Sequence, residues 1–221
     1  MFKQIFNLFK SDSLYQQALE ECYEMLDIDL EMFQESINVL RNKDDSESSF
    51  DIAKTDVKIN KFERSVRRKV MTHLAVSGNE DLGSGLILTS VVIDIERIGD
   101  YTKNIYDLSK FYSKRLNGAE LEKDLKEVED NVIDLFQSSI KAFKDQDITL
   151  ARQLMKDYKE NISKQSDKIT NDIISGKMNI EADTATAIAM YSRYLKRIAA
   201  HSRNLISSIV NPFERIGYKE Q

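Results

Sequence analysis

Apolar residues recur every three or four positions along most of the chain, which is the pattern of amphipathic α-helices. Polar stretches rich in glycine or serine interrupt this pattern at 42–49, 77–85, 117–120 and 175–183. The pattern therefore predicts six helices, at about 13–42, 51–76, 84–115, 119–144, 148–175 and 182–209. Ser13 followed by Gln16 is typical of a capping box for the first helix, and Asp147 is typical of an N-cap for the fifth.

Two of the predicted helices share a sequence motif. The segment "ERIGDYTKNI" (96–105) aligns without gaps with "KRIAAHSRNL" (196–205). This match favours a duplicated three-helix unit, although amphipathic helices also resemble one another by chance. We predict an all-α fold of two tandem, structurally similar three-helix bundles, at 13–115 and 116–210. An amphipathic N-terminal segment, 1–12, precedes them and a C-terminal tail, 211–221, follows.

The third predicted helix carries acids at helical spacing. Glu96 and Asp100 are one turn apart, so their side chains lie on one face and can converge on one ion. Both fall more than a right angle away from the centre of the apolar stripe, which predicts a site on the outside of the bundle. Carboxylates suit hard cations such as Mg²⁺, Mn²⁺ or Ca²⁺, and also iron. The alternative is a solvated helix face on which Arg97 or Lys103 neutralises the acids.

Composition narrows the class of protein. The chain has 221 residues, 41% of them hydrophobic, which is enough for a packed core. A net charge of −5 argues against a non-specific nucleic-acid binder. The single cysteine, Cys22, cannot form an intrachain disulfide and fits a reducing compartment. The longest apolar run, 86–93, is far shorter than the roughly 20 residues of a spanning helix, so we expect a soluble cytoplasmic protein.

No set of residues points to catalysis. His73 and His201 lack the Glu-x-x-His pattern of a di-iron helical bundle. A Ser-His-Asp set is not evident, and "GNEDLGSG" has neither the lysine nor the preceding strand of a phosphate-binding loop. We therefore expect that the protein is not an enzyme.

The segment "ERIGDYTKNI" closely resembles the E-R-I-G-D-x-x-x-N-I signature of the PhoU family of phosphate-uptake regulators. The segments 61–76 and 141–155 also resemble that family, and the resemblance covers about residues 13–210. It implies two tandem three-helix bundles with metal clusters held on the bundle surface by acidic E-x-x-x-D motifs.

Carried over to this sequence, the resemblance assigns Glu96 and Asp100 as metal ligands, with Glu63 and Asn60 of the neighbouring helix as further candidates. The metal would be Mg, Mn, Fe or Zn. The second motif has lost both acids, at Lys196 and Ala200, so only the first repeat is expected to hold a metal.

The resemblance also implies a function. It predicts a regulator of phosphate uptake that binds a membrane phosphate transporter, a sensor histidine kinase, or both. A metal-free helical scaffold for a transporter complex is the alternative. Two basic or amphipathic segments, 1–12 and "RSVRRK" (64–69), leave peripheral membrane association and a homodimer open.

Overall fold

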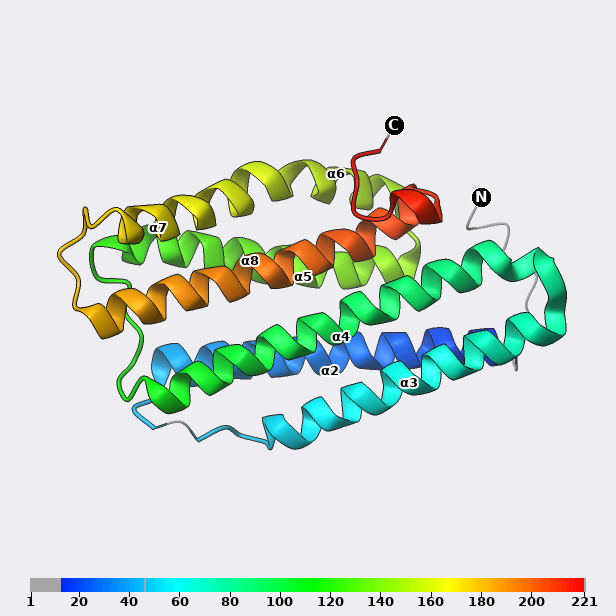
Figure 1. Ribbon diagram of the computed structural model, residues 1–221, viewed down its shortest axis with the longest axis horizontal. Helices are drawn as coiled ribbons and strands as arrows, with labels where there is room; N and C mark the ends of the chain where they lie inside the picture. Colours follow the sequence, from blue (N-terminus) through cyan, green and yellow to red (C-terminus); the bar gives the residue numbers. More distant parts are fainter. Residues whose placement is uncertain (1–12, 46, 221) are drawn as a thin grey trace.

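The computed structural model describes residues 13–45 and 47–220, and its long elements are helices (Figure 1). The first repeat contains α2 (Leu14–Asn42), α3 (Ile52–Ser77) and α4 (Leu82–Phe111). The second contains α5 (Glu122–Asp145), α6 (Ile148–Tyr158), α7 (Lys164–Ile174) and α8 (Ala182–Val210). The prediction of an all-α fold of two tandem three-helix bundles is confirmed. The predicted amphipathic segment, 1–12, lies outside the described residues.

The short elements lie between or after these helices. Single 3-10 turns precede α4 and α5, at Gly78–Asp81 and Ala119–Leu121, and another follows α8 at Phe213–Arg215. A π-helical turn, Lys159–Ser163, joins α6 to α7. The fifth predicted helix, 148–175, is therefore one rod with a wider turn in its middle, and α6, the π turn and α7 together form the second helix of the second bundle.

Two predicted helix starts are formed by the expected side chains. Ser13 Oγ accepts a hydrogen bond from the backbone nitrogen of Gln16 at 3.1 Å, but the Gln16 side chain donates to Glu20, so only half of the capping box forms. Asp147 accepts from the backbone nitrogens of Thr149 and Leu150, both at 3.0 Å. Asp147 is therefore the N-cap of α6, as predicted.

The end of the third helix differs from its prediction. We expected helix to residue 115, but α4 ends at Phe111. The backbone nitrogen of Leu116 donates to the carbonyl oxygen of Leu40, at the end of α2, at 2.9 Å. The segment after α4 thus turns back across α2 instead of continuing the helix.

In the first bundle α2 and α4 run in the same direction, and α3 runs opposite to both (Figure 1). The ring centroids of Tyr15, at the start of α2, and His73, near the end of α3, are 5.8 Å apart. The predicted apolar stripe of α4 is buried at every position: Leu88, Val91, Ile95, Ile98, Thr102 and Ile105. Burial of such stripes is the main driving force for the bundle.

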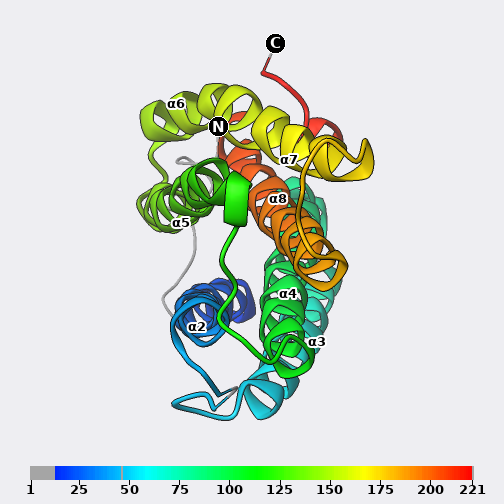
Figure 2. The same cartoon turned by 90° about the vertical axis from the view of Figure 1, so that its left-hand side faces the viewer.

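The two bundles stack along the length of α4 and α8, which contact each other directly (Figure 2). A polar cluster lies in this seam. The Asp94 carboxylate Oδ1 is 2.7 Å from Nδ1 of His201 and accepts a hydrogen bond from Asn204 at 2.9 Å. The His201 ring also stacks on Tyr101, with centroids 5.8 Å apart. His201 therefore has a structural role between the repeats.

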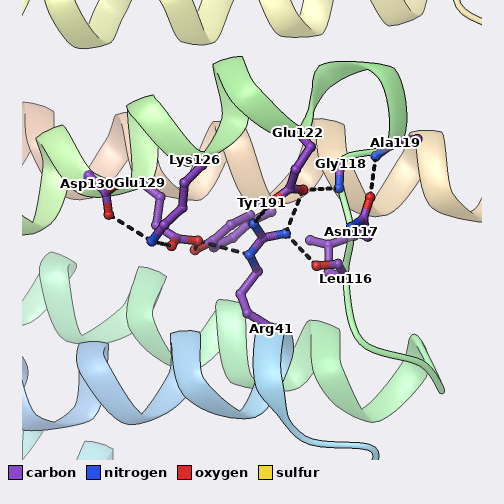
Figure 3. A network of polar contacts seen from close by, with 10 residues as sticks. All are labelled: Arg41, Leu116, Asn117, Gly118, Ala119, Glu122, Lys126, Glu129, Asp130 and Tyr191. Carbon is purple, nitrogen blue, oxygen red and sulfur yellow. Dashed lines mark hydrogen bonds and ion pairs between the residues drawn. The ribbon is translucent and has the colours of Figure 1, made fainter.

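A second network joins the repeats at α2 and α5 (Figure 3). Arg41, at the end of α2, pairs with Glu122 and with Glu129 of α5, the latter at 3.2 Å. Glu129 is buried and also accepts a hydrogen bond from the Tyr191 hydroxyl of α8 at 2.6 Å. Burial, and the neighbouring Glu129 carboxylate, raise the pKa of Tyr191 well above its usual value, so Tyr191 stays a donor. These contacts fix the relative position of the two bundles.

The loop between α2 and α3 is held by Glu35, and this contact makes stability depend on pH. The Glu35 carboxylate accepts hydrogen bonds from Ser49 N, Lys43 Nζ and Asn38 Nδ2. Burial opposes ionisation, but these bonds outweigh it and lower the pKa of Glu35 from 4.5 to about 2. Because the folded-state pKa is lowered, this stabilisation is present above pH 4.5 and is lost as the pH falls towards 2.

We predict that Glu35→Gln flattens the dependence of the free energy of unfolding on pH below 4.5, measured by urea denaturation at several pH values. Glu31→Gln, an exposed position on the same helix, is the control and should leave the slope as in the wild type. Equal slopes for wild type and Glu35→Gln would contradict the assignment.

Candidate cation-binding site

The predicted ligands lie along the seam between α3 and α4. Glu63 and Asn60 come from α3, and Glu96 and Asp100 come from α4. The Glu63 and Glu96 side chains are only 16% and 17% exposed, and Asp100 is 34% exposed. The predicted ligands are therefore partly covered, because α3 packs against one flank of α4. We call this seam, with its partly covered acids, the α3–α4 groove.

Basic side chains from the same two helices pair with the groove acids. Arg97 contacts Asp100 at 2.9 Å and Glu96 at 3.7 Å. Arg67 contacts Glu63 at 2.8 Å. These pairs are half-exposed on the basic side, so each contributes little to stability. The predicted alternative, neutralisation by Arg97, is thus present in the structure.

A further acid of α3, Asp56, lies in the same seam. Its carboxylate accepts from Lys103 Nζ of α4 at 2.9 Å, and its carbonyl oxygen accepts from the Asn60 amide at 3.1 Å. The Asp56 side chain is 7% exposed. Since the Asn60 nitrogen is engaged, the side-chain oxygen is the atom that Asn60 can offer to a cation.

The structure adds an acid from α2, the remaining helix of the first bundle. Asp29 of α2 is fully buried, and neither of its carboxylate oxygens has a hydrogen-bond partner among the described residues. Asp29 Oδ1 approaches the α4 backbone at Gly99, so closely that a Cβ built on Gly99 would lie 2.8 Å from this oxygen. Gly99 stands between Glu96 and Asp100 in the sequence. Asp29 therefore reaches α4 at the level of the groove acids.

These acids influence one another electrostatically. Burial raises the pKa of Asp29 well above its usual value, and the carboxylates of Glu96, Asp56 and Asp100 raise it further. Burial also raises the pKa of Glu96, with Asp100 as the next cause, and Arg97 lowers it only partly. The groove thus carries more negative charge than its basic partners neutralise.

Comparison with known proteins identifies the family. The family model for the PhoU domain matches residues 22–108 and again residues 125–209. The chain belongs to the PhoU family. The two matches correspond to the two helical bundles, so each bundle is one PhoU repeat.

A curated relative and two crystal structures resemble this PhoU chain. The relative, phosphate-specific transport system accessory protein PhoU homolog 1 of Thermotoga maritima, is 30% identical over 119 residues, which are 53% of this chain and 51% of that protein. The match thus spans about half the length of the relative. The crystal structure of PhoU from Pseudomonas aeruginosa has a TM-score of 0.81 at 19% identity, covering 91% of this chain and 97% of that one.

The PhoU crystal structure from Streptococcus pneumoniae, a phosphate transport system regulatory protein, has a TM-score of 0.75 at 19% identity, covering 89% of this chain and 93% of that one. Because each of these proteins is only 19% identical to this chain, the structural resemblance establishes the fold and nothing further.

In the second PhoU repeat, a lysine that pairs with a nearby aspartate stands at a position where the first repeat has an acid. Lys196, which stands where the first repeat has Glu96, contacts both carboxylate oxygens of Asp167 at 2.6 Å. Ser166 lies three residues before the buried Ile169, as Glu63 lies three before the buried Val66. The Ser166 hydroxyl donates to the backbone oxygen of Ser192 at 2.9 Å. The second repeat therefore has an ammonium group at the position where the first repeat has an acid.

The first-repeat groove fits a hard cation in its donor atoms and its charge. Its donors are carboxylate oxygens and one amide oxygen, which are the ligands of Mg²⁺, Mn²⁺ and Ca²⁺. Asp29 is a buried carboxylate with unused oxygens. Within the described residues no three acids, histidines or cysteines are already gathered around one point, so binding of a cation would require the acids to move closer together. The cation would also compete with Arg97 and Lys103, which pair with Asp100 and Asp56.

Asp29 and Asp56 were missed by the sequence analysis. Asp29 does carry a signal, because it falls on the apolar stripe of its helix, three residues after Leu26 and four before Phe33. An acid on such a stripe must meet a partner, a proton or a cation inside the fold. Which helix it meets could not be read from periodicity.

Because Asp29 lies so close to Gly99, we predict that a methyl group added at position 99 lowers the stability of the protein, whereas one added at position 83 does not. Gly99→Ala should destabilise the protein by about 1–3 kcal/mol, because the new Cβ would lie 2.8 Å from Asp29 Oδ1 and 3.1 Å from Ile59 Cδ1. Gly83→Ala, in the same helix with nothing within 4 Å, should stabilise by about 0.5 kcal/mol.

Urea denaturation measures both changes, and an Asp29→Ala background should reduce the cost of Gly99→Ala. If Gly99→Ala were as stable as Gly83→Ala, the close contact between α2 and α4 would be disproved.

Proposed function

We propose that the protein regulates phosphate uptake by binding a membrane phosphate transporter, its sensor histidine kinase, or both, at the cytoplasmic face of the membrane. Membership of the PhoU family and the name of the Thermotoga maritima relative, an accessory protein of a phosphate-specific transport system, support this proposal. In the described part of the chain, no helix has the length and apolarity needed to cross a membrane. Contact with a transporter would then be made from the helix surfaces.

The observation that carries the mechanism is the charge difference between the two repeats. The first repeat has a groove of incompletely neutralised acids, whereas the second has Lys196 paired with Asp167. In the first repeat Glu96 and Asp100, with Glu63 and Asn60, would hold a divalent or iron-type cation. Such a cation supplies positive charge and open coordination positions for a phosphate oxygen or a carboxylate of the partner. The ligands would come from α3 and α4 of the first repeat.

A metal-free scaffold is the second candidate function. Its support is that Arg97 and Arg67 already pair with the groove acids, so the α3–α4 surface is a set of mixed charges without any ion. A scaffold would bind its partner through these charges and the exposed apolar side chains. Metal analysis of protein purified without chelator separates the two candidates.

The experiment is affinity purification of the tagged full chain from membranes of cells grown in high and in low phosphate. We expect phosphate-transporter subunits or the sensor kinase to co-purify in amounts that depend on phosphate. Glu96→Gln/Asp100→Asn should reduce this recovery and the bound metal together, while circular dichroism shows unchanged helicity.

The matched control is Glu120→Gln/Glu214→Gln, which removes two exposed charges outside the groove. It should co-purify partner and metal as the wild type does. Recovery of neither a transporter subunit nor a kinase at any phosphate level would refute the proposed function. Recovery that does not respond to loss of Glu96 and Asp100 would favour the metal-free scaffold.

A further inference from the structure

The most unusual polar group in the described part of the first repeat is Asp29. It comes from α2, a helix that the acidic E-x-x-x-D pattern does not involve. Its exposed fraction is 0%, and both oxygens lack hydrogen-bond partners among the described residues. An ionised carboxylate in such a place costs several kcal/mol unless it is compensated. Asp29 must therefore be neutralised by a proton or by a partner that the described side chains do not supply.

The surroundings of Asp29 are acidic. Besides burial, the carboxylates of Glu96, Asp56 and Asp100 raise the pKa of Asp29, because each disfavours its negative charge. The basic groups of the same seam are used elsewhere: Lys103 contacts Asp56, and Arg97 contacts Asp100. Carboxylates from three helices thus influence one another electrostatically. The innermost of them, Asp29, has no hydrogen-bond partner among the described residues.

Gly99 connects Asp29 to the groove. The absence of a side chain at this position lets Asp29 Oδ1 approach the α4 backbone, where a Cβ would stand only 2.8 Å away. Glu96 lies three residues before Gly99 and Asp100 directly after it. In the second repeat the matching residue is Ala199, which is fully buried. The same space is therefore filled by a methyl group in the repeat that has Lys196.

We propose that Asp29 is the inner ligand of a divalent cation that Glu96 and Asp100 bind from the groove. This proposal rests on the cation site of the proposed function and extends it from two helices to three. Asp29 supplies a carboxylate oxygen from the core side, and the groove acids supply oxygens from the solvent side. The ligand set is made only of oxygens, which favours a hard cation.

The three-helix ligand set has a structural consequence. A cation bound by Asp29 as well as by Glu96 and Asp100 ties α2 to α4, so binding stabilises the whole first repeat. Ligands that bind only the folded state raise its stability by mass action. Asp29→Asn removes the buried charge and keeps the shape, so it should raise the melting temperature of the metal-free protein.

Mn²⁺ is the probe, titrated calorimetrically into the full-length, chelator-treated protein. The wild type should bind Mn²⁺, and Asp29→Asn should bind it at least about tenfold more weakly. Glu96→Gln/Asp100→Asn should abolish binding. Glu31→Gln, two residues further on α2 and exposed, is the matched control and should bind as the wild type.

Thermal unfolding gives a second readout. Mn²⁺ should raise the melting temperature of the wild type and of Glu31→Gln, and should raise that of Asp29→Asn much less. The amide introduced by Asp29→Asn could by itself disrupt the core. Asp29→Ala, which introduces a smaller and apolar side chain, is therefore the second variant. It should show the same loss of Mn²⁺ binding.

The outcomes separate this inference from the proposed function. If Asp29→Asn and Asp29→Ala bind Mn²⁺ as tightly as the wild type while Glu96→Gln/Asp100→Asn does not, Asp29 is no ligand and the groove site stands without it. If the wild type binds no Mn²⁺ at millimolar concentration, the cation site and the role of Asp29 both fail. Loss of binding in the Asp29 and in the groove variants supports the three-helix site.

Discussion

The first repeat is organised around a carboxylate that lies in its apolar core. Asp29 occupies a position on α2 where the neighbouring stripe residues, Leu26 and Phe33, are fully buried. The helices can approach closely there only because α4 has Gly99 at the contact. A buried carboxylate surrounded by other carboxylates must be neutralised by a proton or by a cation. This requirement connects the packing of α2 on α4 with the chemistry of the groove.

The two repeats use one fold with opposite electrostatics. In the first, the acids at Glu96 and Asp100 exceed their basic partners. In the second, Lys196 and Asp167 form an internal pair, and Ala199 fills the place of the glycine. A duplicated bundle can therefore be stable with or without an acidic groove, because core burial and not the groove maintains the helices. The acids of the first repeat are therefore not needed to hold the bundle together.

Much of the fold followed from sequence, because hydrophobic periodicity determines which helix faces are buried. The six predicted helices and the buried stripe of α4 all appear, and Asp147 caps α6 as expected. The end of α4 was placed too late, since Leu116 pairs with a carbonyl of α2 that lies far away in sequence. Likewise the motif predicted Glu96 and Asp100 as ligands, whereas Asp29 could be proposed as a further ligand only once α2 was known to pack against Gly99.

The most direct test of the account is a crystal structure of the full chain grown with Mn²⁺, with anomalous scattering measured to locate the ion. The account predicts an ion in the first repeat at about 2.0–2.6 Å from oxygens of Asp29 and of Glu96 or Asp100. It predicts none beside Lys196. An ion bound equally in both repeats, or Asp29 left buried and unbound beneath an ion in the groove, would contradict it.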